Sequence, residues 1–196
     1  LTFIIFFVLI SQLITSVLIK ERMEKPYRYN EALRLSQSKS DIRNIYNLKL
    51  SNEFSNYINN FTKTFMQSGF KKNQPIIDLS GQSPTVVYLM NGKSIGTAWN
   101  IGGYKGSFDL AKAKFDLVNC KEISNAWIIY EIKGRSISTE LLEYLGADFP
   151  NHYQQMGSWE TAKGAGGYKK PRKQELYKPI NTKLIFDSCN EKRKKN

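Results

Sequence analysis

The chain has 196 residues, a net charge of +12, one histidine and two cysteines. This length is enough for one domain with a core of its own and gives no ground for two. The lone His152 and two cysteines without a CxxC spacing argue against a zinc site, so we expect no metal and no cofactor.

Residues 1–19 (LTFIIFFVLISQLITSVLI) carry no charge, and as a helix they nearly match the hydrocarbon core of a bilayer, about 30 Å thick. A cleavable signal peptide would need a basic start and a small-residue cleavage site, and a buried core helix normally keeps a polar face. We predict that residues 1–19 form a transmembrane helix. Because the chain begins with Leu1 rather than Met, we also expect it to be the C-terminal part of a longer membrane protein.

The positive charge lies on both sides of a nearly neutral middle. Residues 20–74 have a net charge of +6, residues 75–162 of −2 and residues 163–196 of +8. Such flanks suit a domain near anionic headgroups, so we expect the lipid bilayer as a partner. No nucleic-acid motif accompanies them, and nucleic acid is not expected. We interpret residues 191–196 (EKRKKN) as a basic disordered tail.

Residues 20–73 are predicted to form a juxtamembrane helical segment. Its clearest part is residues 51–69, where Phe54, Tyr57, Phe61 and Phe65 recur at helical spacing between a capping Ser51 and a terminal Gly69. An apolar stripe of this kind is a packing surface rather than a ligand site.

Residues 74–190 are predicted to form an α/β domain, because strand-like and helix-like runs alternate along them. Alternation implies crossover connections, so we predict a small three-layer α/β domain with a mainly parallel sheet. The predicted strands are residues 75–79, 95–101, 126–132 and 153–161, and the predicted helices are residues 83–92, 107–119 and 138–146. We interpret residues 166–179, rich in Gly, Lys and Pro, as a loop and residues 182–189 as an edge strand.

Polar residues follow the first two predicted strands. In a parallel sheet these turns emerge at the carboxyl edge, where ligands bind, and Lys105 among three glycines would suit an anion. The candidate ligand-binding residues are Asp78, Ser80, Gln82, Ser83, Asn100, Tyr104, Lys105 and Ser107.

Ordinary turn chemistry is the alternative, with Asp78 and Ser80 capping a helix and the glycines making turns. The Lys-bearing loop matches no nucleotide-binding motif. We expect Trp99, Trp127 and Trp159 to lie in the core rather than stack on sugars, because each falls in a predicted strand.

The run IIDLSGQSPTVVYLMNGK resembles a segment in the soluble C-terminal domains of polytopic bacterial membrane proteins related to lipid-linked-sugar glycosyltransferases. IGGYKGS and GSWETAKGAGGY fit the same pattern, and the resemblance covers roughly residues 70–180. It implies that the catalytic acidic residues lie in loops between earlier membrane helices, so no catalytic residue is assigned in this chain.

The resemblance also implies a location: the bacterial inner (cytoplasmic) membrane, with the soluble domain outside the cytoplasm. Lys20 and Arg22, directly after the apolar run, favour the opposite orientation. That charge rule is weak for long translocated domains, and we follow the resemblance. In an oxidising compartment we expect a disulfide between Cys120 and Cys189, with two separate buried thiols as the alternative.

Two functions remain open. In the first, the chain is the last membrane helix and extracytoplasmic domain of an envelope glycan-assembly protein, accessory to binding of a lipid-linked sugar, an anionic glycan or an acceptor. In the second, it is a non-enzymatic single-pass module that binds an anionic partner through its basic flanks. Any enzymatic activity would be that of a membrane glycosyltransferase with its catalytic residues upstream.

Overall fold

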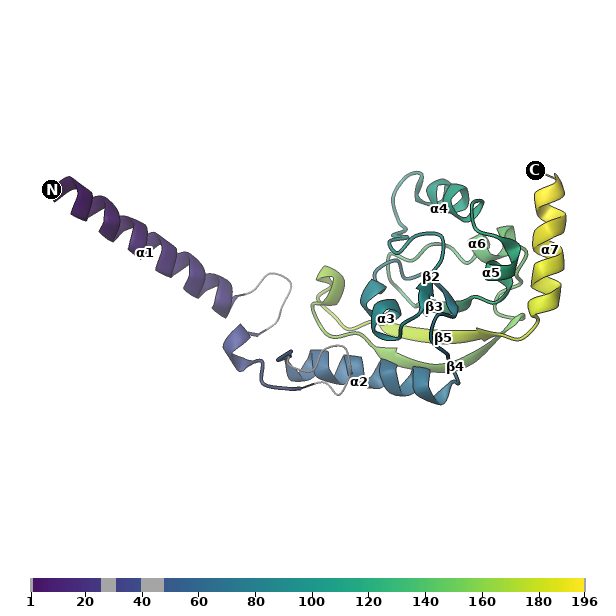
Figure 1. Cartoon of the computed structure of the whole chain (residues 1–196), viewed down its shortest axis with the longest axis horizontal. Coiled ribbons are helices and arrows are strands. Elements are labelled where there is room, and N and C mark those ends of the chain that lie inside the picture. Colours follow the sequence, from purple (N-terminus) through teal and green to yellow (C-terminus); the bar gives the residue numbers. More distant parts are fainter. Residues whose placement is uncertain (1, 26–30, 40–47, 196) are drawn as a thin grey trace. The chain divides into compact units, whose positions relative to one another are not determined.

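The computed structural model describes residues 2–25, 31–39 and 48–195 (Figure 1). The chain divides into two compact units. The first unit comprises Leu1–Asn56 and Ala162–Pro171, and the second, which we call the α/β unit, comprises Tyr57–Thr161 and Arg172–Asn196.

The first unit is dominated by one long apolar helix, α1 (Thr2–Glu24). Its segment Phe3–Glu24 contains an 18-residue stretch with a mean hydropathy of 2.3 and no buried residue, so it is long and apolar enough to cross a membrane. After α1 come the 3-10 helix η1 (Leu33–Leu35) and a single bridge between Ser38 and Leu50. The helical structure predicted for residues 20–73 includes residues 26–30 and 40–47, which are outside the residues that the structure describes.

The α/β unit contains a five-stranded sheet in the order β2-β1-β3-β5-β4. Its strands are β1 (Pro75–Asp78), β2 (Lys93–Ser94), β3 (Trp127–Glu131), β4 (Tyr153–Glu160) and β5 (Lys173–Pro179). β1 pairs in parallel with β2 and β3, whereas β5 is antiparallel to both β3 and β4. The prediction of an α/β protein with an N-terminal apolar helix is therefore confirmed, but the sheet is mixed rather than mainly parallel.

One hydrophobic core cluster joins the sheet to the later helices. Ile77, Leu79 and Ile128 belong to a core cluster with residues of the later helices. These helices are α4 (Ser107–Phe115), α5 (Cys120–Ser124), α6 (Glu140–Tyr144) and α7 (Thr182–Lys195). The short helix α3 (Pro84–Leu89) follows β1. A three-layer arrangement stays an expectation.

The aromatic stripe of α2 (Asn52–Gln67) packs against β4. The ring centroids of Phe61 and Phe65 lie 6.2 and 5.9 Å from that of Trp159. Ser51 accepts a hydrogen bond from the Phe54 backbone, as a capping residue does. From Tyr57 onward α2 belongs to the α/β unit, which therefore begins before the predicted boundary at residue 74.

Three segments differ from their predicted structure. Residues 95–101, predicted as a strand, form a loop after β2, because Gly96 adopts a left-handed φ of 76° that ends the extended run. Residues 173–179, predicted as loop, form β5. Residues 182–195 form α7 in place of an edge strand and a disordered tail, because Ile185 and Cys189, four residues apart, both turn into the core.

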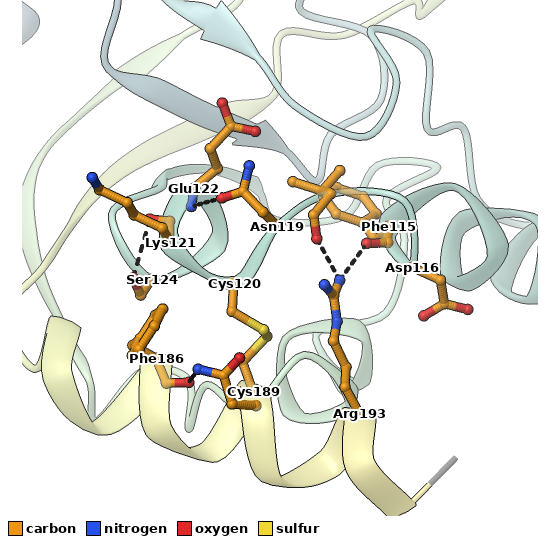
Figure 2. The surroundings of a disulfide bond; sticks show 12 residues. Phe115, Asp116, Asn119, Cys120, Lys121, Glu122, Ser124, Phe186, Cys189 and Arg193 are labelled. Carbon is orange, nitrogen blue, oxygen red and sulfur yellow. Dashed lines mark hydrogen bonds between the residues drawn. A yellow bond between two sulfur atoms is a disulfide. The ribbon is translucent and has the colours of Figure 1, made fainter.

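A disulfide between Cys120 and Cys189 joins α5 to α7 (Figure 2). The two Cα atoms are 5.8 Å apart, across a sequence separation of 69 residues. One turn further along α7, the Arg193 guanidinium donates hydrogen bonds to the carbonyls of Phe115 and Val118. Together these links hold the C-terminal helix on the core.

Replacing both cysteines with alanine should lower the free energy of unfolding by about 2 to 4 kcal/mol, because the unfolded chain loses a long covalent loop. Urea unfolding of the variant and of the oxidised wild type measures the difference. Wild type with reductant is the control and should lose a similar amount. Thiol labelling of the chain in cells, without reductant, should find neither sulfur free; a free thiol at either position would contradict the bond.

Candidate functional site

The turn after β1 is closed around the carboxylate of Asp78. Oδ1 accepts hydrogen bonds from the Ser80 hydroxyl at 2.5 Å and the Gly81 backbone at 3.2 Å, and Oδ2 accepts from the Ser83 backbone at 2.9 Å. The hydroxyls of Ser80 and Ser83 are 2.9 Å apart. All three side chains are buried. The polar groups that the sequence marked as a candidate site are therefore hydrogen-bonded within their own turn.

Gln174 of β5 extends this turn into a larger network. Its amide nitrogen donates to the Ser83 hydroxyl and to Oε2 of Glu131, both at 2.7 Å. Its amide oxygen accepts from Nε1 of Trp159 at 2.9 Å and lies 3.5 Å from the hydroxyl of Tyr57. Arg172 completes the set, donating from Nε to Oε1 of Glu131 at 2.6 Å. We call these residues the buried polar network: Tyr57, Asp78, Ser80, Ser83, Glu131, Trp159, Arg172 and Gln174.

The strand register explains why these side chains meet. Gln174 is paired with Glu131 on one side and with Trp159 on the other. Directly paired residues point to the same face of a sheet, so the three side chains are neighbours. The side chain of Glu131 is fully buried and that of Arg172 is 7% exposed, which makes them a desolvated ion pair.

Burial changes the acidity of two members of the network. It raises the pKa of Asp78 to about 6, against the lowering effect of hydrogen bonds from Ser80, Ser83 and Gly81. Burial also raises the pKa of Tyr57, and the carboxylates of Asp78 and Glu131 raise it further. Tyr57 therefore remains a neutral phenol.

Two loops leave the carboxyl edge of the parallel strands: residues 95–106 follow β2, and residues 132–137 follow β3. Gly81, with a left-handed φ of 65°, lies so close to the Asn100 carbonyl that any side chain there would collide with it. The Gly102 backbone donates to the Arg135 carbonyl at 2.7 Å, and Ile137 donates to the Leu79 carbonyl at 3.0 Å. Residues 95–106 and 132–137 are thereby fixed to the strand ends and to each other.

These loops carry exposed aromatic and basic side chains, which we call the loop surface: Trp99, Tyr104, Lys105 and Arg135. Trp99 is 62% exposed and Tyr104 53% exposed. The prediction that Trp99 lies in the core is wrong, because residues 95–101 are a loop rather than a strand. Trp127 and Trp159 are buried, as predicted.

The predicted site residues separate into two groups. Asp78, Ser80 and Ser83 are hydrogen-bonded to one another, and Asn100 is buried beside Gly81. Tyr104 and Lys105 are exposed, and among the described residues no hydrogen bond or ion pair joins Lys105 to Asp78.

The remaining two predicted residues are only partly available to a ligand. Gln82 is half-buried, and its backbone donates to the Ser80 hydroxyl at 3.3 Å. Ser107 is buried as the first residue of α4, and its backbone donates to the Tyr104 carbonyl at 3.1 Å.

Sequence reasoning missed the part of the buried polar network that lies beyond the turn at Asp78, namely Glu131, Arg172 and Gln174. Glu131 had a detectable signal, since it is a single carboxylate in a nearly continuous apolar strand, where a charge requires a partner. Gln174 and Arg172 had none, because they lie in a Lys- and Pro-rich run that is typical of loops.

A separate shallow hollow of about 290 Å³ lies between the end of α6 and α7. His152 is part of its lining, and Nδ1 of this residue accepts a hydrogen bond from the Asp148 backbone at 3.0 Å. Lys192 donates to the Glu143 carbonyl. The polar groups here are thus bonded largely to nearby backbone, and we assign no ligand to the hollow.

Comparisons with protein-family models, with curated proteins and with solved structures find no match for this chain. Within residues 2–25, 31–39 and 48–195, no group of three or more His, Cys, Asp or Glu side chains is placed to hold a metal ion. The features that bear on function are therefore the loop surface and the buried polar network.

Arg172→Ala should lower the free energy of unfolding by about 3 to 5 kcal/mol, because it leaves Glu131 buried without its charge partner. The neighbouring Lys173→Ala is the matched control. Lys173 is half-exposed in its pair with Glu175 and should cost less than about 1 kcal/mol. Equal losses in urea unfolding of the two variants would show that the buried pair has no special role.

Asp78 should make the protein more stable as the pH falls from 7 towards 4. Its folded pKa of about 6 is above its ordinary value of 3.8, so the folded state binds the proton more tightly and gains about 2 kcal/mol over this range. Unfolding measured as a function of pH checks this. Asp78→Asn should remove this part of the slope, and Asp148→Asn, at an exposed carboxylate, should keep it. A slope unchanged in Asp78→Asn would refute the assignment.

Proposed function

We propose that this chain is the membrane-anchored, extracytoplasmic part of an envelope glycan-assembly protein, and that its α/β unit binds the sugar phosphate of a lipid-linked sugar. The observation that carries this proposal is the loop surface. Trp99, Tyr104 and Lys105 are all exposed in the loop that follows β2, and β2 is parallel to β1, so this loop leaves the carboxyl edge of the parallel strands, where ligands bind.

The chemistry of the loop surface suits such a ligand. Aromatic rings offer apolar faces on which a sugar ring stacks, while Lys105 and Arg135 provide cationic donors for phosphate oxygens. The loops are fixed by backbone hydrogen bonds and by the close contact at Gly81, so binding would require little additional ordering.

The buried carboxylates support a binding role rather than catalysis. Asp78 and Glu131 are each 1% exposed, and both oxygens of each carboxylate accept hydrogen bonds. A general acid or nucleophile must reach the substrate, which these side chains do not. The network is better suited to holding the loops in place, and catalysis belongs to the part of the protein upstream.

Helix α1 supports membrane anchoring. Its segment Phe3–Glu24 is 22 residues and about 33 Å long, enough for a hydrocarbon core of about 30 Å, and no residue of its apolar part is buried in the protein.

The disulfide supports an extracytoplasmic location. Cys120 and Cys189 are bonded, and such bonds persist in oxidising compartments but are reduced in the cytosol. We therefore place the α/β unit on the outer side of the bacterial cytoplasmic membrane. The thiol-labelling experiment described for the disulfide tests this location as well.

A second candidate function has one observation in its favour. Lys192, Arg193 and Lys194 are exposed near the end of α7, where they would attract an anionic partner without any sugar. Binding of this kind would be strongly dependent on salt and insensitive to changes at Trp99.

The loop-surface proposal predicts a fluorescence change on binding, which the full chain in lipid nanodiscs can report. Trp99 is exposed whereas Trp127 and Trp159 are buried, so a polyprenyl-phosphate-linked sugar should alter mainly the Trp99 emission. Trp99→Phe should abolish the change. Lys105→Ala should weaken binding about tenfold through loss of one charged hydrogen bond, with little effect on stability because the lysine is exposed.

Lys183→Ala is the matched control, because Lys183 is also exposed but lies at the start of α7. Binding is also measured with polyprenyl phosphate that carries no sugar and with the free sugar, to show which half of the ligand the protein recognises. Equal effects of Lys105→Ala and Lys183→Ala, or no binding by wild type, would contradict the proposal. Binding of a sugar-free polyanion that depends on Lys192 and Lys194 would favour the second candidate.

A further inference from the structure

Helix α4 has an exposed apolar face. Leu110 and Ala113 of the helix, and Leu117 in the turn that ends it, follow one another at spacings of three and four residues, so they lie on one side. Leu110 is 49% exposed and Leu117 88% exposed. The other side of the helix packs inward through Ala111 and Phe115, which belong to the hydrophobic core cluster. We call Leu110, Ala113 and Leu117 the α4 face.

The loop that carries Trp99 and Tyr104 packs against the same helix. A Cβ atom on Gly96 would lie 2.5 Å from the ring of Phe115, so the start of this loop lies directly on α4. At the end of the loop, the Tyr104 carbonyl accepts a hydrogen bond from the backbone of Ser107, the first residue of α4. The exposed aromatic residues of the loop surface and the exposed leucines of the α4 face are therefore on two segments in contact.

The charges around these apolar side chains are mainly positive, although this part of the chain is acidic as a whole. Residues 75–162 hold seven Lys and Arg and nine Asp and Glu. Five of the seven cations, but only two of the nine acids, lie in α4 and the adjacent loops, residues 95–118 and 132–137. The five cations are Lys105, Lys112, Lys114, Lys133 and Arg135. The occupant of this surface must therefore be apolar and anionic together.

We infer that the α4 face rests on the anionic surface of the bilayer, with Leu110 and Leu117 inserted between the lipid headgroups. This inference rests on the proposed function, in which α1 anchors the chain and thereby keeps lipid at a high effective concentration. A bilayer offers an apolar layer directly beneath a layer of phosphates, and exposed Trp, Tyr and Lys side chains favour that boundary. A membrane helix of another protein would offer the apolar layer without the phosphates.

This contact would bring the loop surface to the depth at which its ligand lies. The phosphate of a lipid-linked sugar is at the level of the headgroups, and Lys105 is two residues before the start of α4. With the α4 face inserted, Trp99 and Lys105 could bind the sugar phosphate while the polyprenyl chain stays in the hydrocarbon. Docking on lipid would thus precede recognition of the sugar.

The test places a fluorophore on the α4 face of the full chain. Ala113→Cys is labelled with an environment-sensitive dye, which the native cysteines do not take up because they are bonded to each other. The chain is reconstituted in vesicles of phosphatidylcholine and phosphatidylglycerol that include a lipid with a quencher on its acyl chain, and no sugar is present. We expect quenching at position 113 and none for the same dye at Gln154→Cys, an exposed position of β4. Equal quenching at both positions, or none at position 113, would overturn the inference.

Substitutions in the labelled chain measure the two parts of the contact. Leu117→Asp should lower the ratio of docked to undocked protein about tenfold, because one leucine no longer leaves water. Met66→Asp is the matched control: Met66 is 77% exposed in α2, and the ratio should not change. Lys114→Glu should weaken docking more in vesicles with phosphatidylglycerol than in phosphatidylcholine alone. Docking of Leu117→Asp at the wild-type level, or equal losses for Lys114→Glu in both kinds of vesicle, would contradict an anionic lipid surface as the occupant.

Further measurements separate failure of the inference from failure of the proposed function. If carbonate removes the chain from the vesicles, α1 is not an anchor and both fail. If the α4 face docks but Lys105→Ala binds the lipid-linked sugar as well as wild type, only the proposed sugar binding fails. If the sugar binds in nanodiscs but position 113 is not quenched, only the inference fails. Cross-linking of Leu117→Cys to another protein in cells, without quenching in vesicles, would assign the face to a protein and overturn the lipid contact.

Discussion

The α/β unit depends on the amide of Gln174. This one side chain bonds to the turn after β1, to Glu131 of β3, to Trp159 of β4 and to Tyr57 of α2. An amide can do this because it has two donors and an acceptor with two lone pairs. In a buried environment each of those bonds is costly to leave unmade, so the four elements are held in one register.

The buried polar network gives the loops above it a rigid base. Asp78 closes the turn that carries Gly81, and Gly81 is in close contact with Asn100 in the loop that exposes Trp99 and Lys105. The carboxylate thus acts on the loop surface from beneath, through the backbone, although it is not accessible to a ligand. Polar residues at a strand end can serve function by fixing geometry rather than by contact.

Periodicity predicted most of the helices and three of the strands, because apolar spacing was strong in those segments. It also indicated the polar turn at Asp78. It failed for β5, where the inward Gln174 breaks the apolar alternation and lysines surround it. It failed for α7, because a short apolar run such as residues 184–186 has no period of its own. The link from Ser83 to Gln174 could not be predicted locally, because it depends on where β5 inserts in the sheet, and the exposure of Trp99 could not, because it depends on where β2 ends.

The position of β5 in the sheet has a consequence for biogenesis. β5 lies between β3 and β4, yet it is the last strand to leave the ribosome. Until it arrives, β3 and β4 each lack the neighbour that β5 provides, and their backbone groups are open to pairing with other chains. A chain shortened before residue 173 would thus lose an internal strand of its sheet rather than an edge strand, and its unpaired strands would make it prone to aggregation and to proteolytic clearance.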